Sequence, residues 1–244
     1  MVNIITLKWG TRYGPEFVNR LRSAVSRHLS LPHNFVCFTD DATGLDAGII
    51  THPIPPLDLP DDKARTPWRK IGLFSDELPI KGACLFLDLD LLVVGSIDCF
   101  FEYEKDRIPI IHNWVEAYKI FKRRPEIGNS SVFRWEAGTC GKIVQQFYGE
   151  KEWALANFRP PQTYLTHCIR DKMVYWPSEW VCSFKRHCIP AFPLNHFMTP
   201  KMPSGVRMVV FHGRPDPDEA VVGYRGTKPH HRCLPTPWVT EHWR

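Results

Sequence analysis

The 244-residue sequence lacks the features that mark several whole classes of protein. It has no apolar run approaching 18 residues, so no segment is expected to cross a membrane. It has no internal repeat, no low-complexity segment and no long run of one charge. With 43% hydrophobic and 23% charged residues, the composition excludes a disordered or collagen-like chain. A chain of this length is expected to bury a core without a metal or disulfide staple.

Cysteine occurs eight times but never as a C-x-x-C pair, so the usual zinc and redox motifs are absent. Cys37 and Cys84 lie in apolar, strand-like runs, which predicts buried and reduced thiols. One segment combines further cysteines with histidines, namely Cys182, His187, Cys188 and His196. The spacing of these four residues fits no standard zinc pattern.

The N-terminal segment is read as a strand rather than a signal peptide, because Met1 to Leu7 has no basic region and no small-residue cleavage site. Together with reduced thiols, this predicts a cytoplasmic protein. The net charge is only +5, and the one basic cluster, between Lys119 and Arg124, is interpreted as a solvated helix face. We therefore expect no nucleic acid partner, whereas a mildly positive surface suits anionic small molecules or lipid head groups.

Short apolar runs alternate with helical patterns along the chain. The expected strands cover residues 2–7, 34–39, 83–87, 108–111, 131–135, 173–175 and 206–211. The expected helices cover residues 15–29, 67–76, 139–149 and 162–171. This alternation predicts a single α/β domain with a mixed central sheet flanked by helices.

Two carboxylates follow directly on the apolar run from Ala83 to Leu87. Because side chains alternate along a strand, Asp88 and Asp90 are expected to point the same way at its carboxyl end. Two like charges beside a dry core are costly unless a cation joins them, and oxygen ligands favour Mg²⁺ or Mn²⁺. The alternative for this pair alone is an acidic turn after a strand.

Four motifs follow one another along the chain. They are Lys70-Ile71-Gly72-Leu73-Phe74 before Leu85-Phe86-Leu87-Asp88-Leu89-Asp90, then Gly95-Ser96-Ile97-Asp98-Cys99-Phe100-Phe101, then Asn129-Ser130-Ser131-Val132-Phe133, and finally Phe211-His212-Gly213. In this order they resemble nucleotide-sugar glycosyltransferases of family 8, which includes glycogenin and bacterial lipopolysaccharide galactosyltransferases. The resemblance implies a single Rossmann-like A-type glycosyltransferase domain, α/β, with a mostly parallel sheet. Residues 1–100 would be mainly the donor half, and residues 101–244 mainly the acceptor half with a metal and phosphate element near 206–215.

The resemblance also implies an activity, which is retaining transfer of a sugar from a UDP-sugar to a glycan or glycolipid. A Mn²⁺ or Mg²⁺ ion held by Asp88, Asp90 and His212 would stabilise the diphosphate leaving group, with Mn²⁺ better suited to the imidazole. The residues expected to bind the donor are Thr6, Leu7, Lys8, Tyr13, Asp40, Lys70, Asp88, Leu89, Asn129 and Gly213. Gln162 and Asp90 are implied as catalytic residues, although Pro161 stands where the family has Asp.

Two other functions remain open at this stage. An apolar strand followed by Asp-x-Asp also opens haloacid-dehalogenase-like phosphatases, in which the first Asp is a nucleophile and Mg²⁺ lies between the pair. That motif usually lies near the N-terminus, whereas more than eighty residues precede Asp88. The third alternative is a nucleotide-binding or sugar-binding module without catalysis. Residues 176–202 are expected to shape the acceptor side, and contact with a membrane is expected only at its surface, through the acceptor.

Overall fold

The computed structural model describes residues 1–114 and 126–244, and the contacts of these residues divide them into two units. Unit 1 comprises Met1–Pro15, Leu31–Asp88 and Cys99–Trp176, and unit 2 comprises Glu16–Ser30, Leu89–Asp98 and Pro177–Arg244. Because the chain passes repeatedly from one unit to the other, these units do not coincide with residues 1–100 and 101–244, whose roles as donor and acceptor halves stay predictions. The basic cluster at Lys119 to Arg124 lies outside the described residues. No helix within the described ranges is long and apolar enough to span a bilayer.

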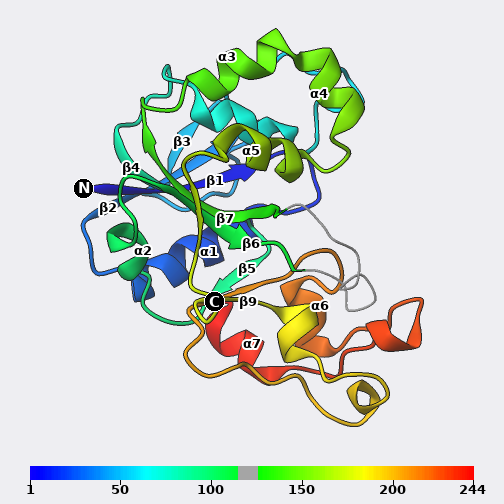
Figure 1. Cartoon of the computed structure of the whole chain (residues 1–244). Coiled ribbons are helices and arrows are strands. Elements are labelled where there is room, and N and C mark those ends of the chain that lie inside the picture. The colour runs from blue at the N-terminus through cyan, green and yellow to red at the C-terminus, as the bar shows by residue number, and fades with distance from the viewer. Residues whose placement is uncertain (115–125) are drawn as a thin grey trace. The chain divides into compact units, whose positions relative to one another are not determined.

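Unit 1 contains a seven-stranded sheet in the order β3-β2-β1-β4-β7-β6-β8 (Figure 1). The strands are β1 (Val2–Lys8), β2 (His33–Thr39), β3 (Ile50–His52), β4 (Gly82–Leu87), β6 (Ile108–His112), β7 (Gly128–Ala137) and β8 (Met173–Tyr175). Strand β7 runs antiparallel to β4 and β6, whereas the other neighbouring pairs are parallel. The expected α/β architecture with a mixed, mostly parallel sheet is thus confirmed.

Helices pack on this sheet through an apolar and aromatic core. They are the 3₁₀ helix η1 (Pro67–Phe74), α2 (Cys99–Glu102), α3 (Lys142–Gly149), α4 (Lys151–Asn157) and α5 (Pro161–Ile169). Figure 1 shows α3, α4 and α5 on one side of the sheet. There Phe74 of η1 stacks on Phe133 of β7, which in turn stacks on Phe86 of β4, with ring centroids 5.6 and 4.9 Å apart. Burial of these large rings is the main stabilising term of this layer.

Arg134 follows Phe133 in β7, and because side chains alternate along a strand it lies on the opposite face of the sheet. Arg134 is only 3% exposed, and its guanidinium donates to the backbone carbonyls of Phe100, Tyr103 and Glu104 at the end of α2. A buried cation at helix carbonyls is stable because the aligned peptide dipoles make that end negative. The single residue therefore holds α2 at the sheet.

Unit 2 contains a three-stranded sheet in the order β5-β10-β9. Its elements are α1 (Pro15–His28), β5 (Leu91–Val93), β9 (Val181–Ser183), the π-type turn η3 (Phe184–Cys188), the short 3₁₀ helices η4 (Leu194–His196) and η5 (Pro229–His231), β10 (Met208–Val210), α6 (Pro217–Val222) and α7 (Pro237–His242). Strand β10 is antiparallel to β5 and parallel to β9. Phe184 and Phe211 stack in its core at 4.3 Å, together with buried cysteines.

The expected elements are largely confirmed, and the differences have physical reasons. The helix expected at residues 67–76 is a 3₁₀ helix that ends at Phe74. Strands β3, β5 and β9, of three residues each, were not expected. Each is defined by its pairing, β3 with β2 and both β5 and β9 with β10. All eight cysteines are free thiols, and burial raises the pKa of Cys37 and of Cys84 to about 12.

Candidate functional site

The order of the central sheet reverses at β1, which lies between β2 and β4. In open α/β sheets, ligands bind in the crevice at such a reversal, beyond the carboxyl ends of the strands. Trp9 follows β1 directly, and two of the expected site residues follow the neighbouring strands, Asp40 after β2 and Asp88 after β4. The topology therefore brings these residues to one edge of unit 1.

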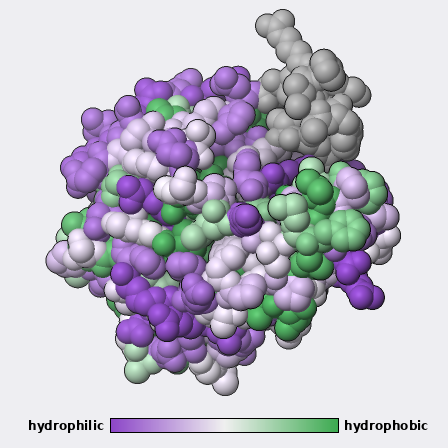
Figure 2. Space-filling model, turned by 90° about the horizontal axis from the view of Figure 1, so that it is seen from below, coloured by the Kyte–Doolittle hydropathy of each residue, from purple (hydrophilic) through white to green (hydrophobic). Residues whose placement is uncertain are grey.

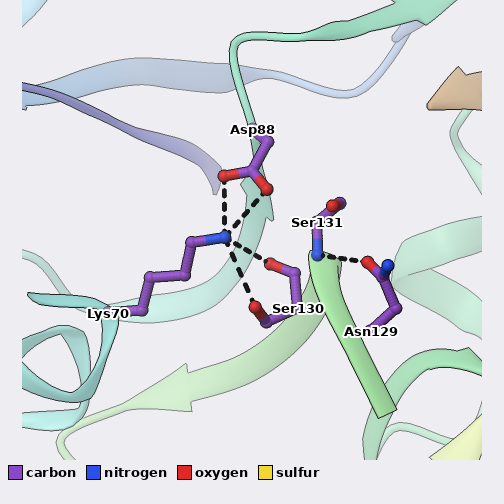
Figure 3. A network of polar contacts seen from close by, with 5 residues as sticks. All are labelled: Lys70, Asp88, Asn129, Ser130 and Ser131. Carbon is purple, nitrogen blue, oxygen red and sulfur yellow. Dashed lines mark hydrogen bonds and ion pairs between the residues drawn. The ribbon is translucent and has the colours of Figure 1, made fainter. Parts of the chain in front are cut away.

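A buried lysine holds the first of the two aspartates. Lys70 of η1 places its Nζ 2.7 Å from Oδ1 and 2.8 Å from Oδ2 of Asp88 (Figure 3). The same ammonium donates to the backbone oxygen of Ser130 at 2.9 Å and lies 4.8 Å from the centre of the Phe86 ring. The Lys70 side chain is 6% exposed, so it is not a solvated helical lysine. An ammonium with these partners neutralises much of the charge that Asp88 would otherwise present.

Strand β7 forms the other wall of this cluster. The backbone carbonyl of Ser131 accepts a hydrogen bond from the backbone N–H of Asp88 at 3.0 Å. The Asn129 side chain accepts from the backbone N–H of Ser131 at 2.9 Å (Figure 3). Asn129 is therefore next to the Lys70–Asp88 pair, but its side chain makes this hydrogen bond within its own strand. Ser130 contributes both a carbonyl and a hydroxyl, the latter 3.4 Å from the Lys70 Nζ.

A cavity of about 630 Å³ opens at the ends of β1, β2 and β3. Its lining includes Trp9, Asp40, His52, Ile54, Arg65 and Arg69. One oxygen of Asp40 accepts the N–H of Gly10 at 3.0 Å, and the Trp9 indole donates to the Arg65 carbonyl at 3.2 Å. A carboxylate, an aromatic ring and two guanidinium groups suit a polar, anionic ligand with a planar ring.

The sequence did not single out His52, Arg65 or Arg69 as site residues. His52 ends the three-residue strand β3, and the two arginines flank the start of η1. Arg69 immediately precedes Lys70, and its Nε donates to the carbonyl of Ala64 at 2.7 Å. The motif that contains Lys70 was the one sequence signal that could have indicated Arg69, because η1 positions both residues.

The expected residues of the first strand lie mostly behind this cavity. Thr6, Leu7 and Lys8 are buried in β1 and, with Tyr13, are absent from the described lining of the cavity. The Lys8 ammonium donates to the carbonyl of Asp41 at 3.1 Å and so ties the ends of β1 and β2. Tyr13 lies under the Arg12 guanidinium at 4.9 Å. Their side chains support the edge of the sheet, and Trp9 is the residue from this stretch that faces the cavity.

In unit 2 the chain brings the second aspartate next to the histidine motif. The backbone N–H of Phe211 donates to the carbonyl of Asp90 at 2.8 Å, which extends the antiparallel pairing of Leu91 with Val210. Asp90 and His212 are more than 120 residues apart in sequence, yet they emerge at the same end of this strand pair. Leu89, another expected donor contact, is buried, with 5% of its surface exposed.

His212 is held neutral by its surroundings. Burial, reinforced by the cations Lys185 and Arg186, lowers its pKa to about 4. Its Nε2 lies 2.6 Å from the Ser183 hydroxyl. Gly213 has a positive φ of +78°, which favours glycine. A Cβ atom added there would lie 3.4 Å from the Lys185 ammonium, so the glycine leaves space beside this cation.

Arg214 follows Gly213 in the sequence, but its guanidinium is paired with carboxylates. Its Nη1 pairs with Asp216 at 3.3 Å and with Glu219 at 2.5 Å, both at the start of α6. The cation next to Gly213 is therefore Lys185 rather than Arg214. Lys185 was not among the expected site residues, because nothing in the sequence pairs residue 185 with residue 213.

The expected metal ligands are divided between the units, with Asp88 in unit 1 and Asp90 and His212 in unit 2. Among the described residues, no group of three or more His, Cys, Asp or Glu side chains is gathered as a metal site, and this includes the cysteines and histidines of residues 182–196. The ligand types nevertheless fit a divalent ion, because carboxylates are hard oxygen donors and a neutral imidazole can donate a nitrogen lone pair to a metal. The metal site remains a prediction.

Gln162 lies in the first turn of α5, directly after Pro161. Proline suits the first helical position because it brings no N–H that needs a partner. One turn later, Thr166 accepts from the backbone N–H of Gly128, so α5 is fixed against β7 next to Asn129. Gln162 and the Lys70–Asp88 cluster thus share β7 as a common support within unit 1.

No protein-family model and no curated protein matches the sequence. Solved structures match its fold. The galactosyltransferase LgtC, in complex with donor and acceptor sugar analogues, aligns over 88% of this chain and 89% of its own with a TM-score of 0.61 and 15% identity. The glycosyltransferase GlyE of Streptococcus pneumoniae TIGR4 aligns with a TM-score of 0.63 and 12% identity, covering 89% of this chain but 56% of its own. The chain therefore has the A-type glycosyltransferase fold that its motifs indicated.

Proposed function

We propose that this protein is a metal-dependent glycosyltransferase that moves a sugar, with retention, from a UDP-sugar to a glycan or glycolipid acceptor. The observation that carries the proposal is the Lys70–Asp88 cluster at the reversal of the sheet, together with a cavity of about 630 Å³ that Arg69, the residue before Lys70, helps to line. A fold shared with two glycosyltransferases supports it.

Each cluster has a distinct task in this proposal. Asp88, Asp90 and His212 would hold a Mn²⁺ or Mg²⁺ ion, which supplies Lewis acidity to the departing diphosphate. Lys185 next to Gly213 would bind diphosphate oxygens, because an ammonium and an open backbone suit close approach of an anion. Gln162, at the start of α5, would orient the donor sugar.

The Lys70–Asp88 pair explains why donor and metal should bind together. Two ammonium contacts occupy both oxygens of Asp88, so its negative charge is largely balanced before any ion arrives. A carboxylate still has free lone pairs for a second cation, but the attraction to that cation is weaker. The negative charge that completes the site would come from the diphosphate of the donor.

The first test follows from this coupling. We expect Mn²⁺ and UDP together to raise the melting temperature of the protein more than the sum of their separate shifts. The measurement is a thermal-shift titration, with Asp90→Asn as the variant that should lose the metal-dependent part. Equal shifts by UDP with and without Mn²⁺ would contradict the proposed site.

The second test addresses the cavity in unit 1. Asp40→Ala is expected to weaken UDP binding by about tenfold, because loss of one charge-assisted hydrogen bond costs about 1.5 kcal/mol. Binding is measured by titration calorimetry. Asp40→Asn serves as the control for loop structure, since its amide oxygen still accepts the N–H of Gly10, and Asp106→Ala removes an exposed carboxylate elsewhere. Unchanged affinity in Asp40→Ala would place the nucleoside outside this cavity.

The two alternatives predict different products. A phosphatase would hydrolyse a phosphate ester, and a binding module would bind a nucleotide sugar without turnover. The antiparallel pairing of β4 with β7 and the match to glycosyltransferase structures give the phosphatase no support in the fold. Release of UDP in the presence of an acceptor, and of no inorganic phosphate, is the expected result.

A further inference from the structure

One short segment of unit 2 displays several large apolar side chains to solvent. Four of the nine exposed large apolar residues among those described lie within seven positions of each other: Phe192, Leu194, Phe197 and Met198. Phe197 is 79% exposed and Phe192 is 59% exposed. Figure 2 shows green hydrophobic side chains gathered on one part of the face it displays, with purple hydrophilic ones beside them. A cluster of this kind on a folded surface marks an interaction site.

This segment is held in a defined conformation. The loop of residues 188–201, here called the apolar loop, is closed at its base by a bond from the backbone N–H of Lys201 to the carbonyl of Cys188 at 3.0 Å. Asn195 at its centre is 1% exposed, and its side-chain amide donates to the carbonyls of Pro229 and Arg232 at 3.1 and 2.9 Å. Asn195 fixes the loop with its apolar side chains pointing outward. A partner can therefore bind them at little further cost in conformational entropy.

The anchor of Asn195 lies in a second loop that is strongly cationic. Residues 225–232, here called the basic loop, contain Arg225, Lys228, His230, His231 and Arg232. The Arg232 guanidinium lies 3.3 Å from the His196 ring nitrogen, which adds a second contact between the two loops. The apolar side chains therefore have basic residues next to them within unit 2.

Acidic residues are absent from two stretches around the apolar loop, and the four residues between these stretches add Asp216, Asp218 and Glu219. Residues 180–215 contain five Lys or Arg and no Asp or Glu, and residues 220–240 contain three Lys or Arg and no Asp or Glu. Asp216 is buried and Glu219 pairs with Arg214, so basic residues outnumber acidic ones around the apolar loop and favour a partner with negative charge. A second copy of this chain, paired symmetrically through the same patch, would bring the two basic loops together and repel.

We propose that the apolar loop and the basic loop form a docking surface for an anionic phospholipid bilayer. Aromatic and aliphatic side chains at the tip enter the boundary between head groups and acyl chains, while Lys and Arg beside them contact lipid phosphates. This binding requires no sugar donor, so it is independent of the proposed sugar transfer. If the acceptor is a glycolipid, the same surface places the enzyme where that acceptor lies.

The experiment is flotation of the full chain with vesicles of 70% phosphatidylcholine and 30% phosphatidylglycerol. We expect binding at least about tenfold stronger than to pure phosphatidylcholine, and a similar loss in Phe192→Ser/Phe197→Ser. Because both side chains are exposed, the variant should keep the wild-type melting temperature. Val222→Ser, which removes an apolar side chain that is 73% exposed on α6, is the matched control and should bind as the wild type does.

A second variant tests the contribution of the basic loop to vesicle binding. Arg225→Glu/Lys228→Glu should lower binding to the level seen with pure phosphatidylcholine, because both side chains are exposed and lie in the basic loop. Equal flotation of the wild type and the Phe192→Ser/Phe197→Ser variant would overturn the proposal. A concentration-dependent dimer that the same variant abolishes, without any vesicle binding, would overturn it too and assign the patch to a second copy.

Discussion

Asp90→Asn is expected to lower the rate of sugar transfer by at least about 10²-fold. Asparagine keeps the size of the side chain but removes the charge of a proposed metal ligand. Strand pairing should survive, because the bond from Phe211 goes to the backbone carbonyl of Asp90 and not to its carboxylate. The measurement is release of UDP from a UDP-sugar in the presence of Mn²⁺ and acceptor.

The control for this variant must separate loss of chemistry from loss of fold. Asp106→Asn makes the same change at an exposed carboxylate outside the site and should keep full activity. The melting temperature of Asp90→Asn in the absence of ligand should match that of the wild type. An Asp90→Asn enzyme with wild-type turnover would mean that the acidic pair is a turn after a strand and nothing more.

Asp88→Ala is expected to reduce the free energy of unfolding by about 2–4 kcal/mol, in contrast to Asp90→Asn. Its removal leaves the ammonium of Lys70, whose side chain is 6% exposed, without the carboxylate that balances it. The loss of stability should be smaller than for a fully buried ion pair. The Asp88 side chain is 25% exposed, and the Ser130 carbonyl still accepts from the Lys70 ammonium. Urea denaturation followed by fluorescence measures the change.

A double-mutant cycle isolates the pair itself. Lys70→Met should cost less than Asp88→Ala, since the unpaired carboxylate is the more exposed partner and water can solvate it. The double variant Asp88→Ala/Lys70→Met should regain part of the stability lost in Asp88→Ala, because no unpaired buried charge remains. Strictly additive losses would show that the two groups do not interact. The cycle also explains why loss of activity in an Asp88 variant is weaker evidence for a metal ligand than loss in an Asp90 variant.

Local pattern alone was enough to predict much of the scaffold. The long apolar strands β1, β2, β4 and β7 and the amphipathic helix α1 were predicted within a few residues, because their burial is visible as alternation or as a helical stripe. The same patterns located the acidic pair at the end of β4. The resemblance of four motifs then indicated the A-type glycosyltransferase fold, which the structure confirms.

Contacts between residues far apart in sequence were decided only by the tertiary structure. Strand β5 exists because it pairs with β10, and that pairing sets Asp90 next to Phe211. The partners of Lys70 come from β4 and β7, and the cation beside Gly213 is Lys185, a residue that no motif marks. Charge, burial and hydrogen bonding depend on what lies across from a side chain, which a one-dimensional pattern does not record. The sequence by itself thus determined which residue types end each strand, and the folded chain determined which of them meet.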